Sequence, residues 1–113
     1  MEGIKKGGVP YQVIIADEFM FMAKRLGQFL TSRGFAVTGT AANGAEAVAL
    51  YKTLYPNVDL VTLDISMPEI DGITALKQIL EFDKQAKVVM TGALGDQDIV
   101  KKCILNGGQE FHR

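Results

Sequence analysis

The sequence has little of the material on which several classes of protein depend. It contains one cysteine, Cys103, so no internal disulfide can form. Its one histidine, His112, has no partner ligands near it in the sequence, so we expect neither a metal site nor catalysis there. Lysine plus arginine (12) and aspartate plus glutamate (13) nearly balance, which leaves no basic face for nucleic acid and no acidic tail. A disulfide-stapled secreted domain and a nucleic-acid partner are therefore not expected.

Long apolar runs are missing as well. No stretch approaches the roughly 20 apolar residues that span a bilayer. The N-terminal segment MEGIKKGGVPYQV lacks the apolar stretch and cleavage site of a signal peptide. Neither GxxxxGK[ST] nor GxGxxG occurs, so we expect no nucleotide to bind through these loops. We therefore expect a cytoplasmic protein with no membrane partner. We also expect one domain, because 113 residues suffice for one hydrophobic core and not for two.

What the sequence does contain is a regular alternation of two patterns. Short apolar runs rich in β-branched residues predict strands at 11–16, 35–41, 59–64 and 87–91, with the start of a fifth at 109–113. Amphipathic spacing predicts helices at 19–33, 43–55, 72–83 and 97–108. The apolar residues that define this spacing are Phe19, Met22, Ala23, Leu26, Phe29 and Leu30 in the first helix and Ile73, Leu76, Ile79 and Leu80 in the third. This alternation indicates an α/β fold with a parallel sheet covered on both faces. Residues 1–10, rich in glycine and lysine, are expected to be a flexible tail, and 11–113 a single domain.

Acidic residues follow two of these strands. Asp17 and Glu18 come after the first strand, and Asp64 ends the third. Because ligands of doubly wound sheets bind beyond the carboxyl ends of the strands, we expect the three carboxylates to converge at one edge. Like charges this close repel one another unless a cation joins them, and an all-oxygen set of ligands suits Mg²⁺. A carboxylate beside such an ion can attack phosphorus, so Asp64 is a candidate phosphoacceptor.

The acids also have a simpler interpretation. Taken alone, Asp17-Glu18 is typical of an acid pair stabilised by the dipole of the helix that follows. With Asp64 and the turn MPEIDG at 67–72, however, the pattern resembles the receiver domain of two-component response regulators, close to the stand-alone chemotaxis type. The resemblance extends over 11–113 and implies a flavodoxin-like (βα)₅ fold, a doubly wound parallel sheet of order 2-1-3-4-5.

The same resemblance implies a site and partners. Glu18, Asp64 and the backbone carbonyl of Ser66 would hold Mg²⁺, with Asp17 acting through water. Asp64 would receive a phosphoryl group from a histidine kinase, a phosphotransfer protein or a small phosphodonor. The phosphorylated chain would then act on a downstream protein target.

The sequence departs from the receiver pattern in two places. Receivers carry a serine or threonine at the end of the fourth strand, where this chain has Gly92, with Thr91 one residue early. A one-residue offset turns a side chain to the other face of a sheet, so Thr91 is expected to substitute only if a bulge or register shift brings it round. The lysine, proline and fifth helix of the family would follow Arg113, so the expected fold has an incomplete last strand and no last helix. An open sheet edge of this kind favours a homodimer.

Three functions remain open at this point. The first is a phosphoacceptor receiver, which is no enzyme beyond self-catalysed phosphoryl transfer and aspartyl-phosphate hydrolysis. The second is a degenerate receiver that acts as a phosphorylation-independent dimerisation or binding module. The third, a phosphohydrolase with an aspartyl nucleophile, ranks last because that class usually has a second acid where Ser66 stands. Met20, Phe21 and Met22 include one exposed helix face that could contact a kinase or target, but core packing or simple surface exposure is the favoured interpretation.

Overall fold

The computed structural model describes residues 3–64, 67 and 72–91. The elements are, in chain order, β1 (Gln12–Ala16), α1 (Met20–Ser32), β2 (Ala36–Ala41), α2 (Gly44–Leu54), β3 (Leu60–Leu63), α3 (Gly72–Phe82) and β4 (Val88–Met90). The four strands and three helices predicted in this part of the chain are confirmed, with each end shifted by at most one residue. The helix predicted at 97–108 and the strand at 109–113 lie outside the described residues.

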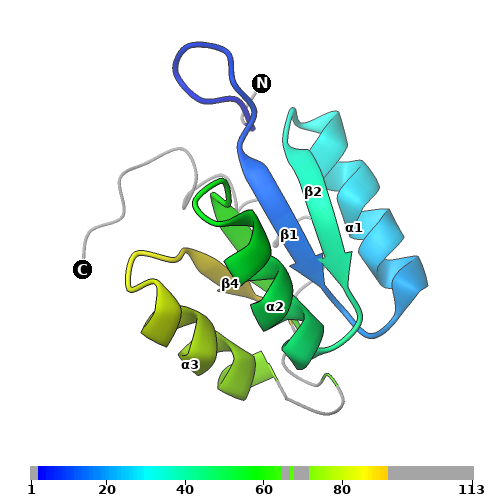
Figure 1. Cartoon of the computed structure of the whole chain (residues 1–113). Helices are drawn as coiled ribbons and strands as arrows, with labels where there is room; N and C mark the ends of the chain where they lie inside the picture. The colour runs from blue at the N-terminus through cyan, green and yellow to red at the C-terminus, as the bar shows by residue number, and fades with distance from the viewer. Residues whose placement is uncertain (1–2, 65–66, 68–71, 92–113) are drawn as a thin grey trace.

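The strands form one parallel sheet in the order β2-β1-β3-β4. This order agrees with the first four positions of the predicted 2-1-3-4-5 sheet. The chain runs outward from β1 to β2 on one side and from β3 to β4 on the other, so the order reverses between β1 and β3. Helices α2 and α3 cover one face and α1 the other (Figure 1). The fold is therefore doubly wound, and its switch point lies between the two central strands.

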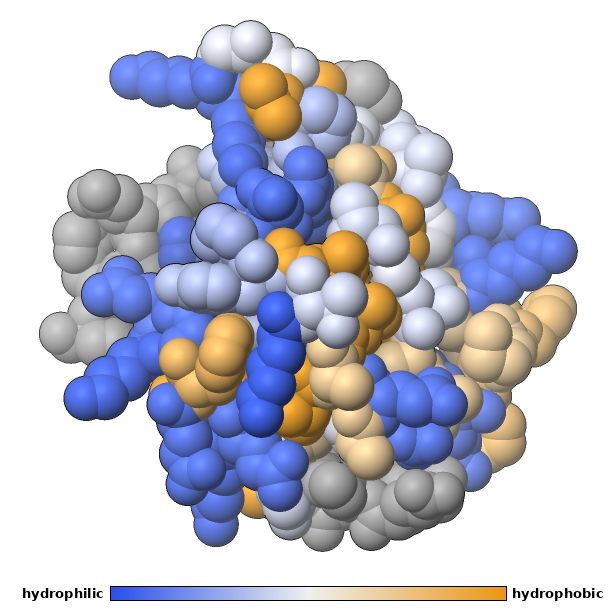
Figure 2. Space-filling model, in the orientation of Figure 1, coloured by the Kyte–Doolittle hydropathy of each residue, from blue (hydrophilic) through white to orange (hydrophobic). Residues whose placement is uncertain are grey.

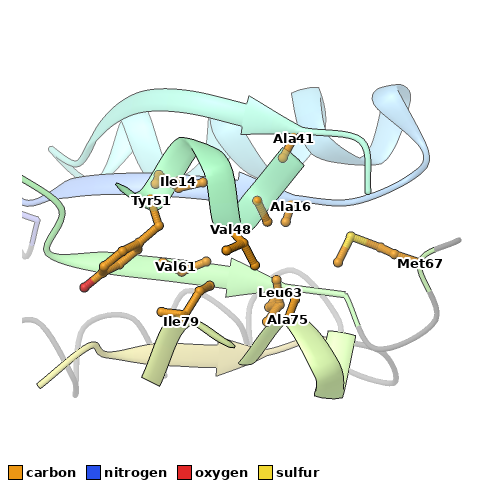
Figure 3. Packing of buried hydrophobic residues seen from close by; sticks show 11 residues of the cluster. Ile14, Ala16, Ala41, Val48, Tyr51, Val61, Leu63, Met67, Ala75 and Ile79 are labelled. Carbon is orange, nitrogen blue, oxygen red and sulfur yellow. The ribbon is translucent and has the colours of Figure 1, made fainter. Parts of the chain in front are cut away.

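Successive residues of the strands pack alternately into two separate cores, one on each face of the sheet. Val13 and Ile15 of β1 pack toward α1, together with Leu60 of β3. Their neighbours Ile14 and Ala16 pack toward α2 and α3, in the cluster drawn in Figure 3. All five side chains are at most 1% exposed. Because both faces of the central strands are buried, the strands read as continuous apolar runs in the sequence.

The apolar face of α1 differs from the predicted one. The spacing of apolar residues predicted that Phe19 and Met22 share the buried stripe with Ala23, Leu26 and Leu30. The last three are at most 5% exposed, but Phe19 is 60% exposed and Met22 is 39% exposed. The prediction was therefore wrong for the start of the helix. Periodicity shows which side of a helix is apolar, but not how far each turn of that helix extends over the sheet.

Residues 3–10 make specific contacts with the rest of the domain. Ile4 and Pro10 form an antiparallel bridge, and the Gly3 N–H donates to the Arg33 carbonyl at 2.7 Å. Lys5 Nζ lies 3.0 Å from Asp59 Oδ1, just before β3. The predicted division into a flexible tail at 1–10 and a domain at 11–113 stays a prediction, and these contacts show where the segment attaches. No helix in the described part of the chain is long and apolar enough to cross a membrane.

Candidate functional site

Asp17 and Asp64 lie side by side where the two central strands end. The Asp64 N–H donates to the Ala16 carbonyl at 3.0 Å, and the Asp17 N–H donates to the Ala41 carbonyl at 2.9 Å. Both bonds continue the pairing of the strands by one residue beyond their ends. The backbone of the two central strands therefore fixes both carboxylates at the switch point of the sheet.

The two carboxyl groups are close enough to share a hydrogen bond. Burial raises the pKa of Asp17 above its ordinary value of 3.8, a hydrogen bond from the Phe19 N–H acts in the opposite direction, and the charges of Asp64 and Glu18 raise the pKa further. The bond from Phe19 is 2.9 Å long and ends on Asp17 Oδ1. Asp64 is only 7% exposed. This is a partly desolvated pair of like charges, which a cation would stabilise.

Glu18 does not complete a group of three acids in this structure. Among residues 3–64, 67 and 72–91, no set of three His, Cys, Asp or Glu side chains is close enough to hold a metal ion. The predicted convergence is therefore seen for Asp17 and Asp64, while the role of Glu18 as a ligand stays a prediction. Ser66, the other predicted ligand, lies outside the described residues.

The pair nevertheless fits a magnesium ion. Mg²⁺ in proteins is commonly held by one or two carboxylates, and water and phosphate oxygens complete its shell. Asp17 and Asp64 supply the carboxylates, with oxygen as the only donor atom. Burial first, and then the charges of Asp64 and Glu18, raise the pKa of Asp17, and a cation beside the pair would favour the ionised form.

Thr91 is placed beside Asp64 by the register of the sheet. Leu63 pairs with Met90, and the Thr91 N–H donates to the Leu63 carbonyl at 2.9 Å. The next pair along the two strands is therefore Asp64 and Thr91, and no register shift interrupts this ladder. Since Leu63 and Met90 both face the core under α2 and α3, alternation places Asp64 and Thr91 together on the opposite side. Thr91 is 8% exposed, and its role stays a prediction.

Met67 is a contributor that sequence reasoning assigned only to a turn. It is 4% exposed and packs in the same core cluster as Ala16, Ala41 and Leu63 (Figure 3). Three residues after Asp64, the chain is thus anchored to the core by a large apolar side chain. The signal that could have indicated the burial of Met67 was a large apolar residue among the polar, proline and glycine residues of the turn at 67–72. Asp71, whose expected role was in the turn, lies outside the described residues.

Comparison with known proteins supplies a family for this arrangement. The family model described as the response regulator receiver domain matches residues 13–111. The chain is 52% identical over 109 residues to the chemotaxis protein CheY of Treponema pallidum, covering 96% of this chain and 76% of that protein. It is 45% identical over 101 residues to CheY of Bacillus subtilis, covering 89% and 82%. Among solved structures, the CheX-CheY-BeF3-Mg²⁺ complex from Borrelia burgdorferi matches with a TM-score of 0.79 and 52% identity, over 93% of this chain and 79% of that one.

Proposed function

The chain belongs to the response regulator receiver domain family, and we propose that Asp64 is the residue on which it accepts a phosphoryl group. It is a CheY-like receiver of two-component and chemotaxis signalling, a signalling protein and not a conventional enzyme. The observation that carries the assignment of Asp64 is its position. It is a nearly buried carboxylate in contact with Asp17, at the switch point where ligands of such sheets bind.

The chemistry follows from the two carboxylates. An oxygen of Asp64 attacks the phosphorus of a phosphohistidine, the O–P bond forms as the N–P bond breaks, and the imidazole leaves with the electron pair and takes a proton from solvent. Mg²⁺, when bound, neutralises the negative charge that gathers at the pair and on the phosphoryl oxygens. Asp17 and Asp64 would hold the ion, with Glu18 and the Ser66 carbonyl as the further ligands implied by the family. The relative from Borrelia burgdorferi was solved with Mg²⁺ and BeF3.

Thr91 is the proposed hydroxyl partner of the phosphoryl group. Its place beside Asp64 in the sheet register supports this role without the bulge or register shift that we expected it to require, although Gly92 occupies the position where receivers carry their serine or threonine. A hydroxyl that donates to a phosphoryl oxygen would stabilise the charge of the acyl phosphate.

The partners proposed for this site are proteins. A histidine kinase or phosphotransfer protein would supply the phosphoryl group, and a downstream protein would read it. The Borrelia burgdorferi relative is in complex with a CheX protein, so a protein of that kind is a further proposed partner. The homodimer expected from an open sheet edge stays a prediction, since the chain after Thr91 lies outside the described residues. A cytoplasmic location, expected from the single Cys103, belongs to the same proposal.

Intact-mass spectrometry after incubation with acetyl phosphate and Mg²⁺ tests the assignment of Asp64. We expect the native chain to gain the mass of one phosphoryl group, and the Asp64→Asn variant to gain none. Omission of Mg²⁺ should abolish the adduct on the native chain. An adduct of equal yield on both chains would overturn the assignment of Asp64. No adduct on either chain would favour the alternative function, a degenerate receiver that serves as a binding module.

A further inference from the structure

The peptide group that joins Ala41 to Ala42 makes a hydrogen bond at each of its two ends. Its carbonyl oxygen, at the end of β2, accepts from the Asp17 N–H at 2.9 Å. Its N–H, on Ala42, donates to Glu46 Oε1 at 2.8 Å. Because a peptide group is planar, the second bond restrains the direction in which the carbonyl points. Glu46, in the first turn of α2, is thus linked to Asp17 through one rigid group.

Capping of α2 does not account for the place where Glu46 binds. Asn43 is the N-cap of this helix, and its side chain accepts from the Glu46 N–H at 2.8 Å. In the usual capping box, the acid three residues after the N-cap accepts in return from the N–H of the N-cap residue itself. The Glu46 carboxylate instead accepts from Ala42, one residue earlier. The bond is therefore directed at the peptide group that supports Asp17.

The two ends of this link lie in different surroundings. Ala41 is 1% exposed and packs in the core cluster with Ala16, which is the last residue of β1 to pair with β2 and directly precedes Asp17. Glu46 is exposed, and α2 begins near the carboxyl ends of β1 and β2 (Figure 1). In the space-filling view, atoms of hydrophilic residues lie around this end of α2, toward the lower right (Figure 2). A substitution of Glu46 therefore leaves the core intact and acts on Asp17 through the bond from Ala42.

Two physical effects connect Glu46 to the carboxylate pair. A charged acceptor on the N–H polarises a peptide group, which strengthens the bond that its carbonyl accepts. The strengthened bond restrains the backbone of Asp17, whose carboxyl group contacts Asp64. When an outer partner that orients a metal ligand is removed, the metal affinity commonly falls by about tenfold or more.

We propose that Glu46 is a positioning residue of the phosphoacceptor site, which orients Asp17 toward Asp64 and Mg²⁺ through the peptide group of Ala41 and Ala42. The inference rests on the proposed function, since it takes Asp17 and Asp64 as the residues that hold the ion. It goes further by giving an exposed residue of α2 a part in phosphoryl transfer, which it performs through Asp17 and not on the reacting atoms.

Hydrogen exchange at the Asp17 amide, followed by NMR in EDTA, tests the link without metal or phosphodonor. The exchange rate is expressed relative to that of the Ile14 amide in β1, so that a general loss of stability cancels. We expect this relative rate to rise about tenfold in Glu46→Ala, because the bond that restrains the Ala41 carbonyl is lost. Glu46→Gln retains an oxygen that can accept from the Ala42 N–H, so its relative rate should stay within about twofold of the native one.

The rate of labelling by acetyl phosphate, measured over a series of Mg²⁺ concentrations, reports the effect on the site. The Mg²⁺ concentration that gives half of the maximal rate should rise about tenfold in Glu46→Ala and stay close to the native value in Glu46→Gln. Tyr51→Phe is the matched control, because it removes the 2.6 Å bond from the Tyr51 hydroxyl to Asp83 Oδ2 at the other end of α2. This control should change neither the Mg²⁺ requirement nor the relative exchange rate of the Asp17 amide.

The outcomes separate the positioning role from the proposed function. A native chain that is not labelled overturns the proposed function, and the role of Glu46 at the site with it, whatever the amide exchange shows. A native chain that is labelled, with the same Mg²⁺ requirement as Glu46→Ala, overturns the positioning role alone. The same conclusion follows if Glu46→Gln is as impaired as Glu46→Ala, or if Tyr51→Phe reproduces the effects of Glu46→Ala.

Discussion

Replacement of Asp17 by asparagine should stabilise the protein in the absence of metal. The folded state raises the pKa of Asp17, first by burial and then by the charges of Asp64 and Glu18. The folded chain therefore binds this proton more tightly than the unfolded chain does. Its stability falls as the pH rises from 3.8 through the folded pKa, and the loss persists at neutral pH. Asparagine removes the charge but retains an oxygen that can accept the hydrogen bond from the Phe19 N–H.

The size of the effect follows from the environment of the pair. Two unit charges 4 Å apart repel by about 1 kcal/mol in bulk water and by about 4 kcal/mol at the effective dielectric constant of a protein surface. Because Asp17 is only partly buried, the lower figure applies. We expect the Asp17→Asn variant to gain about 1 kcal/mol in free energy of unfolding, which corresponds to a rise in Tm of about 4 °C for a domain of this size.

Thermal unfolding followed by circular dichroism at pH 7 measures the Tm without metal, in EDTA, and with metal, in excess Mg²⁺. The native chain should gain Tm when Mg²⁺ is added, whereas the variant should start higher in EDTA and gain less. Glu81→Gln, which removes an exposed acid from α3, is the matched control and should change the stability by no more than about 0.5 kcal/mol. A variant that is less stable than the native chain in EDTA, or that gains as much from Mg²⁺, would refute the reasoning.

Two further predictions concern residues around the site. Thr62→Val should raise the free energy of unfolding by about 1 kcal/mol in urea denaturation, because Thr62 Oγ1 is buried without a hydrogen-bond partner in the described part of the chain; a loss of stability would contradict this. Met67→Ala should cost about 3 kcal/mol and slow labelling by acetyl phosphate, because it removes the buried anchor of the segment after Asp64. Met67→Leu keeps most of the volume, so its cost should stay below about 1.5 kcal/mol, and equal losses in the two Met67 variants would count against the anchor.

Local patterns predicted the elements well, whereas the order of the strands was predicted from the resemblance to the receiver family. The sequences of β1 and β3 are continuous apolar runs that contain β-branched residues, and Gly34 and Asn43 mark boundaries between elements. Each end of an element therefore differs from its predicted position by at most one residue. Orientation was harder to predict. In α3, Ile73 belonged to the predicted apolar spacing, yet it is 50% exposed while Ala75 is fully buried. The spacing of apolar residues identifies the apolar side of a helix, whereas the burial of each residue depends on whether it faces the sheet.

The candidate site was predictable to the extent that it depends on strand ends. The positions of Asp17 and Asp64 follow from two strands that end at the same edge, which the sequence indicates. The place of Thr91 depends on the register between β3 and β4, which is a contact between distant segments that no local pattern contains. The same holds for Met67, whose burial requires the core formed by three other elements.

Two features of this edge oppose the stability of the isolated chain, and they lie next to each other. The carboxylate pair brings like charges together in a partly desolvated place, and the start of α1 exposes the large apolar side chains of residues 19–22 to water. The exposed apolar side chains do not help α1 or the sheet to fold, and departures from local rules of this kind concentrate at functional sites. The two costs differ in what would relieve them, since a divalent cation would neutralise the acids, whereas the apolar side chains would have to be removed from water. Mg²⁺ should therefore stabilise the folded chain by relieving the first cost alone.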